Sequence, residues 1–160
     1  MLKYICSLFT VNDIEESKRF YTEVLNQKIK YDFGENITFE GDFALHKREH
    51  FSHLIDKSLI SASNNSELYF EYDNLSALQN RLEKEEVEFL HKIKEQPWRQ
   101  QVLRFYDPSK NIIEVGESIE HLAFRLWKEG KSMEKIGELT NMGKDFAEKS
   151  IKAYSNRKDL

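Results

Sequence analysis

The order of predicted elements repeats within the first 117 residues, and this repeat constrains the fold more than any other feature of the chain. A strand rich in β-branched and aromatic residues is predicted at 3–11, and a helix follows it from Asp13, with Glu16 at the capping-box position. Short strands separated by turn residues come next, at 28–33, 37–41 and 43–47.

The second half of this region has the same order. After a short predicted helix at 49–56 and the polar loop 61–66, a strand is predicted at 67–72 and a helix at 73–87. Three more strands follow, at 88–95, 101–107 and 111–117. Two successive modules of strand, helix and three strands predict an α+β fold of paired βαβββ modules, with sheets that face one another.

The composition changes after Glu117, and Ser118 is the predicted boundary between a domain at 1–117 and a helical extension at 118–160. Helices are predicted in this extension at 119–130, 132–140 and 144–154. They resemble helix-turn-helix segments of bacterial regulators. The extension has nine Lys and Arg against seven Asp and Glu, a net charge of +2, while 1–117 carries −6. This asymmetry is small for a surface that neutralises several phosphates, so the sequence favours a packing or dimerisation role over binding of nucleic acid.

The totals exclude several classes of protein. The chain of 160 residues has a net charge of −4, which gives no overall attraction to nucleic acid or anionic membranes. A single cysteine excludes an intramolecular disulfide framework and fits a reducing compartment. The sequence shows neither a signal peptide nor an apolar run long enough to span a membrane. A cytoplasmic protein without a membrane partner is expected.

The last strand of the second module contains a charge among apolar residues. Glu114 lies between Ile113 and Val115, and side chains alternate along a strand. If Ile113 and Val115 pack beneath the helices, then Glu114 faces the opposite side. A buried carboxylate without a partner is costly, so Glu114 is expected to face water, to pair with another group or to take part in chemistry.

Two motifs resemble those of the vicinal oxygen chelate superfamily, which includes glyoxalase I, bleomycin and fosfomycin resistance proteins and extradiol dioxygenases. They are "VNDIEESKRFYTEVL" at 11–25 and "RFYDPSKNIIEVGE" at 104–117. The resemblance covers residues 1–117. It implies curled sheets that enclose a cavity, a metal held by the first and fourth strands of each module, and a homodimer.

The resemblance also implies a ligand set. The family's metal positions correspond to Cys6, His46, Glu67 and Glu114, which would hold a divalent Zn, Ni, Fe or Mn ion. Glu114 would be a catalytic metal ligand, and Glu67 a ligand or a displaceable base. Three of these positions depart from the family's usual His/Glu pattern, and many members bind no metal. Cys6 as a small buried residue and His46 as a histidine near solvent are the alternatives.

Further residues are expected to contact a ligand. Alternation places Tyr69 and Glu71 on the same face as Glu67, and acids beside a tyrosine favour a metal or a cationic ligand. In the loop "QPWRQQ", Trp98 would stack on a planar group and Arg99 would bind an anionic one, unless this loop is only a surface turn. The other histidines fall in no ligand spacing and are expected at the surface: His50, His53, His91 and His121.

Three functions follow from these observations. The sequence favours a small-molecule-binding protein that sequesters or senses a ligand in the cavity between the modules. The first alternative is a divalent-metal-dependent lyase, isomerase or dioxygenase, in which the metal stabilises an enolate or oxyanion. The second alternative is a ligand-responsive regulator whose C-terminal helices bind DNA.

Overall fold

The computed structural model describes residues 1–157, which form two compact units. The first unit comprises Met1–Leu68, Arg81–Glu88 and Tyr106–Ile113. The second unit comprises Tyr69–Asn80, Phe89–Phe105 and the chain from Glu114 onward. Within residues 1–157, no helix has both the length and the apolar character needed to cross a membrane.

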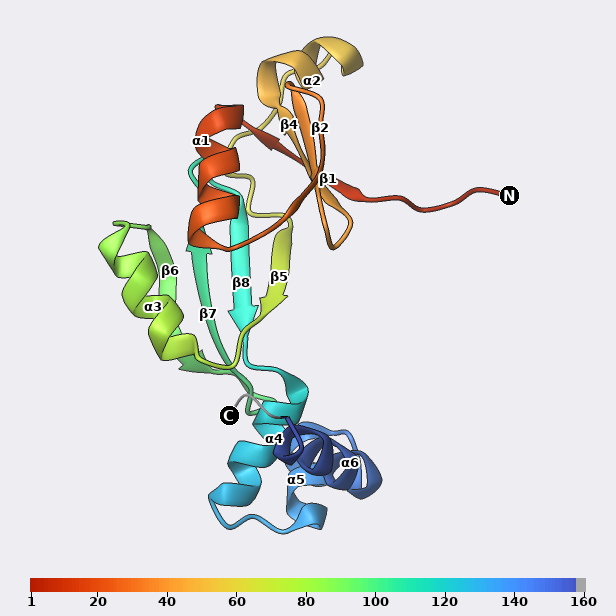
Figure 1. Cartoon of the computed structure of the whole chain (residues 1–160), viewed down its shortest axis with the longest axis vertical. Coiled ribbons are helices and arrows are strands. Elements are labelled where there is room, and N and C mark those ends of the chain that lie inside the picture. Colours follow the sequence, from red (N-terminus) through yellow and green to blue (C-terminus); the bar gives the residue numbers. More distant parts are fainter. Residues whose placement is uncertain (158–160) are drawn as a thin grey trace. The chain divides into compact units, whose positions relative to one another are not determined.

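The first predicted module forms a sheet of four strands (Figure 1). Its strand order is β1-β4-β3-β2, with bounds Ser7–Val11, Phe43–Lys47, Asn36–Phe39 and Ile29–Asp32. β1 pairs with β4 in parallel, and the other neighbours are antiparallel. The first strand is shorter than predicted. It begins at Ser7 because its partner Phe43 is the first residue of β4, so the residues from 3 to 6 have no strand beside them.

A helix covers the apolar face of this sheet. α1 (Ile14–Arg19) begins after Asp13, whose Oδ1 accepts a hydrogen bond from the Glu16 backbone N–H at 2.9 Å, as the capping motif predicts. The helix continues as a π-helical turn, η1 (Phe20–Val24). Tyr21 is fully buried there, with its ring 5.6 Å from those of Phe39 and Phe43. A second helix, α2 (Arg48–Ile55), follows β4 directly.

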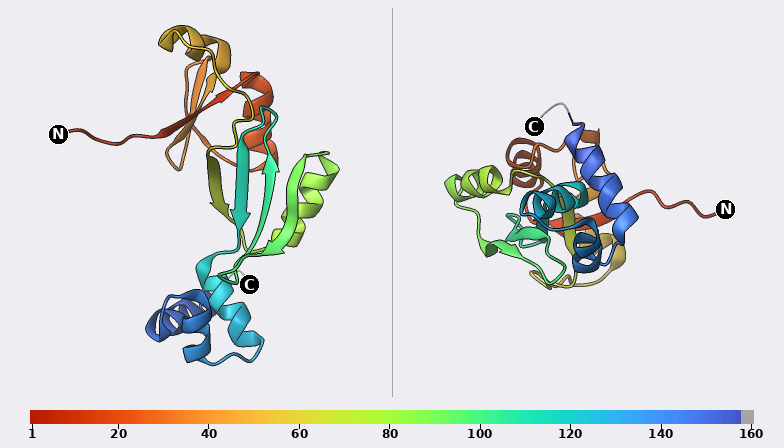
Figure 2. Two further views of the ribbon diagram at one scale, coloured as in Figure 1. Left: turned by 180° about the vertical axis from the view of Figure 1, so that it is seen from behind. Right: turned by 90° about the horizontal axis from the view of Figure 1, so that it is seen from below.

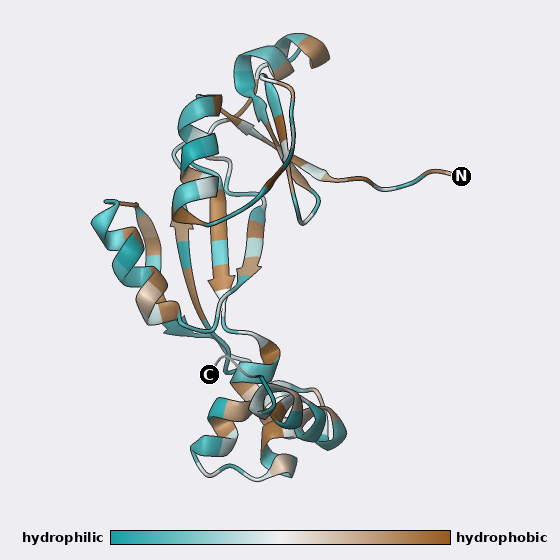
Figure 3. Ribbon diagram, viewed as in Figure 1, coloured by the Kyte–Doolittle hydropathy of each residue, from teal (hydrophilic) through white to brown (hydrophobic). Residues whose placement is uncertain are grey.

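The second predicted module also forms a sheet of four strands, in the order β5-β8-β7-β6. The bounds of these strands are Glu67–Glu71, Ile112–Gly116, Gln101–Tyr106 and Phe89–Glu95. α3 (Leu75–Lys84) buries Leu75, Leu78 and Leu82, as their spacing predicts. Figure 3 shows β8 as a mainly hydrophobic strand with a hydrophilic interruption. The two sheets with their helices confirm the predicted α+β fold with C-terminal helices.

The C-terminal segment folds into three helices of the second unit, α4 (Ile119–Lys128), α5 (Met133–Thr140) and α6 (Lys144–Ser155), which pack together in both views of Figure 2. Their common core consists of Leu122, Ala123, Leu126, Ile136, Ala147 and Ile151. Ser118 is the N-cap of α4, and its side chain accepts from the His121 N–H. The predicted division of domains at Ser118 stays a prediction, and residues 158–160 of the predicted extension lie outside the described residues.

Within the second unit, Glu117 joins α4 to strand β7. This fully buried carboxylate accepts from Arg125 Nη2 at 2.7 Å and Arg125 Nε at 3.1 Å, and it lies 2.8 Å from His121 Nδ1. The Gln101 backbone N–H donates to it at 2.8 Å. The expectation that His121 is a surface residue was therefore wrong, because its ring is drawn toward this buried acid.

Candidate functional site

Glu114 points away from the core side of β8. Its neighbours Ile113 and Val115 are buried, which places Glu114 on the opposite face, as alternation predicts. Glu114 is itself only 5% exposed, and it forms an ion pair with Arg104 of the adjacent strand β7. A guanidinium beside a buried carboxylate offsets part of the cost of removing that charge from water.

Arg104 connects Glu114 to β6. Arg104 Nη1 lies 3.2 Å from His91 Nε2, and His91 is the register partner of Arg104. The expectation that His91 is a surface residue was wrong, since the ring is half-buried beside the guanidinium. Arg104 was not among the residues singled out from the sequence. It nevertheless lies between the apolar residues Leu103 and Phe105, the same pattern that drew attention to Glu114.

Three of the predicted ligand-binding residues are joined through Gln100. Trp98 Nε1 donates to Gln100 Oε1 at 2.9 Å, and Gln100 Nε2 donates to Tyr69 Oη at 2.9 Å. Tyr69 Oη in turn donates to Glu71 Oε1 at 3.3 Å. Partial burial raises the pKa of Tyr69, so the phenol keeps its proton in this chain of hydrogen bonds. We call Tyr69, Glu71, Trp98 and Gln100 the aromatic–amide chain.

Gly116 allows this arrangement to form on the same face of β8 as Glu114. A Cβ at Gly116 would lie 2.9 Å from Gln100 Nε2 and 3.0 Å from Tyr69 Oη. These distances are too short for a side chain, so glycine permits both polar groups to approach the strand. The sequence signal for Gln100 was weak, because an amide side chain in a loop follows no periodic pattern.

Arg99 does not join the aromatic–amide chain through its charge. Its Nη1 lies 3.1 Å from Glu95 Oε1, and its backbone carbonyl accepts from Arg125 Nη2 at 2.8 Å. Its φ of +73° places the residue in the left-handed region, at a turn between β6 and β7. The predicted role of Arg99 as an anion-binding residue stays a prediction.

The predicted site residues of the first unit lie in different surroundings. Cys6 precedes β1 and is half-buried, while Glu67 is exposed at the start of β5. His46, on β4, is buried rather than near solvent. Its Nδ1 lies 3.2 Å from Asn36 Nδ2, and its Nε2 lies 2.9 Å from His50 Nδ1. Burial, followed by the nearby His50, lowers the pKa of His46 and favours the neutral ring.

The four predicted ligands do not form a preorganised metal site. Across residues 1–157, no three His, Cys, Asp or Glu side chains are grouped closely enough to hold a metal ion. Both ring nitrogens of His46 already have hydrogen-bonding neighbours, and Glu114 is paired with a guanidinium. A divalent cation would have to displace Arg104 before it could bind Glu114 Oε2, the oxygen that faces the guanidinium.

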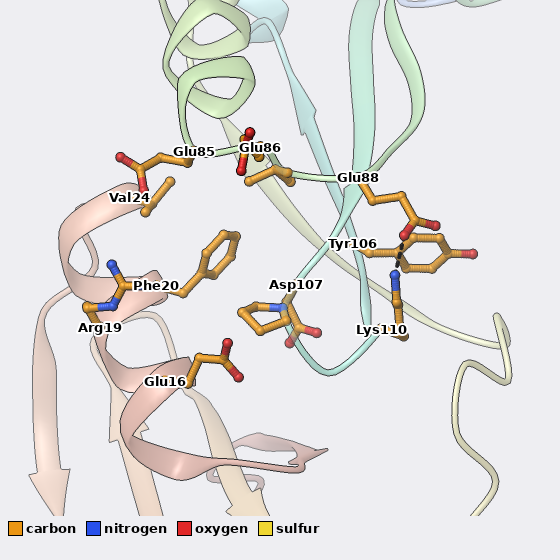
Figure 4. A pocket seen from close by; sticks show the side chains of 12 residues that line it. Glu16, Arg19, Phe20, Val24, Glu85, Glu86, Glu88, Tyr106, Asp107 and Lys110 are labelled. Atoms are coloured by element: carbon orange, nitrogen blue, oxygen red, sulfur yellow. Dashed lines mark hydrogen bonds and ion pairs between the residues drawn. The ribbon is translucent and has the colours of Figure 1, made fainter.

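The first unit has a pocket of about 280 Å³ beside the Asp-Pro motif, shown in Figure 4. Apolar residues, among them Phe20 and Val87, line it together with Glu16, Glu85, Glu86 and Glu88. Lys110 also lines it and forms an ion pair with Glu88. We call this cavity the acidic pocket, because its carboxylates outnumber its cations.

The repeated modules, each a four-stranded sheet with its helix, define a protein built from paired βαβββ units. The family model for a glyoxalase-like domain matches residues 4–120, so this chain belongs to the glyoxalase-like family. The predicted resemblance is thereby confirmed. A search of curated proteins found no match.

Solved structures with the same fold support this assignment. A protein of unknown function from Agrobacterium tumefaciens str. C58 is 37% identical, with a TM-score of 0.66 over 74% of this chain and 96% of that chain. A lactoylglutathione lyase from Agrobacterium tumefaciens is 16% identical, with a TM-score of 0.55 over 74% and 95% of the two chains. A glyoxalase-related enzyme from Fulvimarina pelagi is 19% identical, with a TM-score of 0.61 over 70% and 86%. The last two similarities show the fold alone.

Proposed function

We propose that this protein binds a small planar organic cation at the aromatic–amide chain and that it does so without a metal. The observation that carries the proposal is the ion pair between Glu114 and Arg104, in which a guanidinium supplies the positive charge beside the family's glutamate position. With that charge supplied by the protein, a metal is not needed to compensate the carboxylate.

The exposed groups of the aromatic–amide chain set the class of ligand. Trp98 is 40% exposed and Tyr69 is 46% exposed, so both rings are available for stacking. Glu71 is exposed, and it has no cationic partner among the residues that the structure describes. Two aromatic rings next to a carboxylate without a cationic partner favour a flat ligand that carries an amine or another cation.

A titration with tryptamine, a planar amine, tests this proposal. We expect tryptamine to raise the melting temperature of the wild-type protein, and we expect EDTA to leave that shift unchanged. Trp98→Ala should weaken binding by about tenfold, since it removes one stacking surface. The matched control is Trp127→Ala on α4, because Trp127 is also 40% exposed but lies outside the aromatic–amide chain.

A measurement of bound metal tests the metal-dependent alternative. The metal content of protein purified without chelator should be substoichiometric, and it should be the same in Glu114→Gln. If the wild type retains one equivalent of zinc, nickel, iron or manganese that Glu114→Gln loses, the proposal fails. It fails equally if EDTA abolishes the binding of tryptamine, or if Trp98→Ala binds as the wild type does.

A further inference from the structure

Within the described part of the chain, a second pocket of the first unit is lined by cations and by no acidic residue, in contrast to the acidic pocket. Its volume is about 230 Å³, somewhat below the range of about 300–1,000 Å³ that is usual for drug-sized ligands. It is lined by β1, by the first turns of α2, by the segment between α2 and β5, and by residues 110–112. We call it the Arg48 pocket, after the cation on α2 that lines it.

Arg48 carries a charge that the protein does not neutralise. Its Nε is buried and has no hydrogen-bond partner, and no carboxylate pairs with the side chain within residues 1–157. Lys110, the other cation of the lining, forms an ion pair with Glu88. A partly buried guanidinium without a partner is costly, and its fork of N–H donors matches a carboxylate or a phosphate. Arg48 is therefore available to an anionic ligand.

No acidic side chain opposes such a ligand. Among the described residues that line the Arg48 pocket, none is Asp or Glu. The polar side chains of the lining are instead hydroxyls and amides, including Thr10, Ser63 and Ser66. These groups form hydrogen bonds with an anion without repelling it.

The remaining walls are apolar and open to solvent. Leu8 on β1 is 40% exposed and Ile60 is 80% exposed, while Phe51 and Ile112 are half-buried. Covering such surface with an apolar ligand body stabilises the complex by about 25 cal/mol for each Å² removed from water. The ligand should therefore combine a negative head, placed at Arg48, with a short apolar body.

We propose that the Arg48 pocket binds a small monocarboxylate with an apolar body. The small volume favours a short alkyl or single-ring compound over a nucleotide or a long lipid. The proposal goes beyond the planar cation proposed above. The two candidate sites share no residue, because the aromatic–amide chain lies in the second unit. The two ligands also have opposite charges.

Three compounds of the same length separate the effect of charge from that of the apolar body. Hexanoate, hexanamide and hexylammonium are titrated into the full-length protein by calorimetry, and the perturbed amide signals are mapped by NMR. We expect hexanoate to bind at least tenfold more tightly than hexanamide, because a hydrogen-bonded ion pair is lost with the neutral amide. Hexylammonium should bind more weakly still. The perturbed signals should come from β1, α2 and the segment 59–66.

Substitution of the guanidinium tests the assigned group directly. Arg48→Gln should lower the affinity for hexanoate by about tenfold or more, and Arg48→Lys should recover part of that loss. The matched control is Arg19→Gln, because Arg19 is an exposed arginine of the acidic pocket in the same unit. This control should bind hexanoate as the wild type does. The melting temperature of each unliganded variant confirms that it is folded.

Several results would overturn the proposal. These are the absence of hexanoate binding at millimolar concentration, equal affinity for hexanoate and hexylammonium, and unchanged affinity in folded Arg48→Gln. Testing each variant with both ligands keeps the two proposals apart. Trp98→Ala should leave the affinity for hexanoate unchanged, and Arg48→Gln should leave the affinity for tryptamine unchanged, so either proposal can fail alone.

Discussion

Each unit of this protein buries a carboxylate that accepts several hydrogen bonds, yet the pKa values of the two groups shift in opposite directions. In the first unit, Asp107 accepts from Tyr21 Oη at 3.1 Å and from the Ser109 and Asn111 backbone N–H groups at 2.8 Å. Burial raises the pKa of Asp107, and these hydrogen bonds offset only part of that effect. No cation pairs with Asp107 among residues 1–157.

In the second unit, Glu117 is fully buried and has a cationic partner. Burial alone would raise the pKa of Glu117, but hydrogen bonds from His121, Arg125 and the Gln101 backbone outweigh it, and the pKa is lowered. The difference teaches that the donors around Asp107 only moderate the cost of burying a carboxylate, whereas His121 and the bidentate guanidinium of Arg125 together reverse it at Glu117. The ion pair between the buried Glu114 and Arg104 belongs to the same unit, so both of these pairs of a buried carboxylate with a guanidinium lie in the second unit.

The largest expected effect comes from breaking the charge pair at Glu117. Glu117→Gln keeps the shape of the side chain but leaves Arg125 without its buried counterion, and we expect the free energy of unfolding to fall by about 3 kcal/mol. The lowered pKa of Glu117 implies that its contribution is present above pH 4.5 and is lost as pH falls through the folded pKa. Urea unfolding at pH 7 and at pH 3 measures both effects, and hydrogen exchange should show that α4 opens.

The matched control for this prediction is Glu129→Gln. Glu129 contacts the same Arg125 at 2.9 Å, but its side chain is 43% exposed. A surface pair of this kind contributes about 0.5 kcal/mol or less. Equal destabilisation by the two substitutions would show that burial does not distinguish the two pairs, and the comparison between the units would lose its basis.

A smaller effect is expected at Asp107, where the partners are neutral. Tyr21→Phe removes one donor without changing the packing of the ring against Phe39 and Phe43, and we expect a loss of about 1 kcal/mol. Because the Tyr21 hydrogen bond lowers the pKa of Asp107, its removal should raise that pKa further. A raised folded pKa means that stability is present below pH 3.8 and is lost as pH rises through the folded value.

Unfolding curves from pH 3 to pH 7 measure this dependence. The decline in stability with rising pH should extend to higher pH in Tyr21→Phe than in the wild type. Tyr31→Phe is the control, since the Tyr31 ring is exposed and its hydroxyl has no hydrogen-bond partner within the described part of the chain. An identical pH profile for the wild type and Tyr21→Phe would contradict the assignment of Asp107 as a group moderated by neutral donors.

The fold could be predicted because its signals are local or periodic. The Asp13 cap, the leucines of α3 and the turn residues between strands each depend on a few neighbouring positions. The same is true of the direction of Glu114, which follows from alternation with Ile113 and Val115. The repeat then combines these local signals into two modules.

The partners in the candidate site could not be predicted in the same way. Arg104 meets Glu114 only because β7 lies next to β8 in the sheet, and strand order is a property of the tertiary structure. Gln100 joins Trp98 to Tyr69 from a loop whose path follows no period. His46 was expected near solvent, because the sequence does not show that His50, one helical turn beyond β4, approaches its ring.

The smallest expected effect concerns the pair of histidines in the first unit, His46 and His50. Because burial and His50 lower the pKa of His46, stability is present above pH 6.5 and is lost as pH falls through the folded pKa. His46→Gln keeps an acceptor for Asn36 but removes the titrating ring. The decrease in unfolding free energy between pH 7 and pH 5 should therefore become smaller, by about 1 kcal/mol or less. His53→Gln, at an exposed position on α2, should keep the wild-type slope. If His46→Gln also keeps that slope, then the pKa of the buried His46 ring is not lowered, and the ring does not contribute to the loss of stability at acid pH.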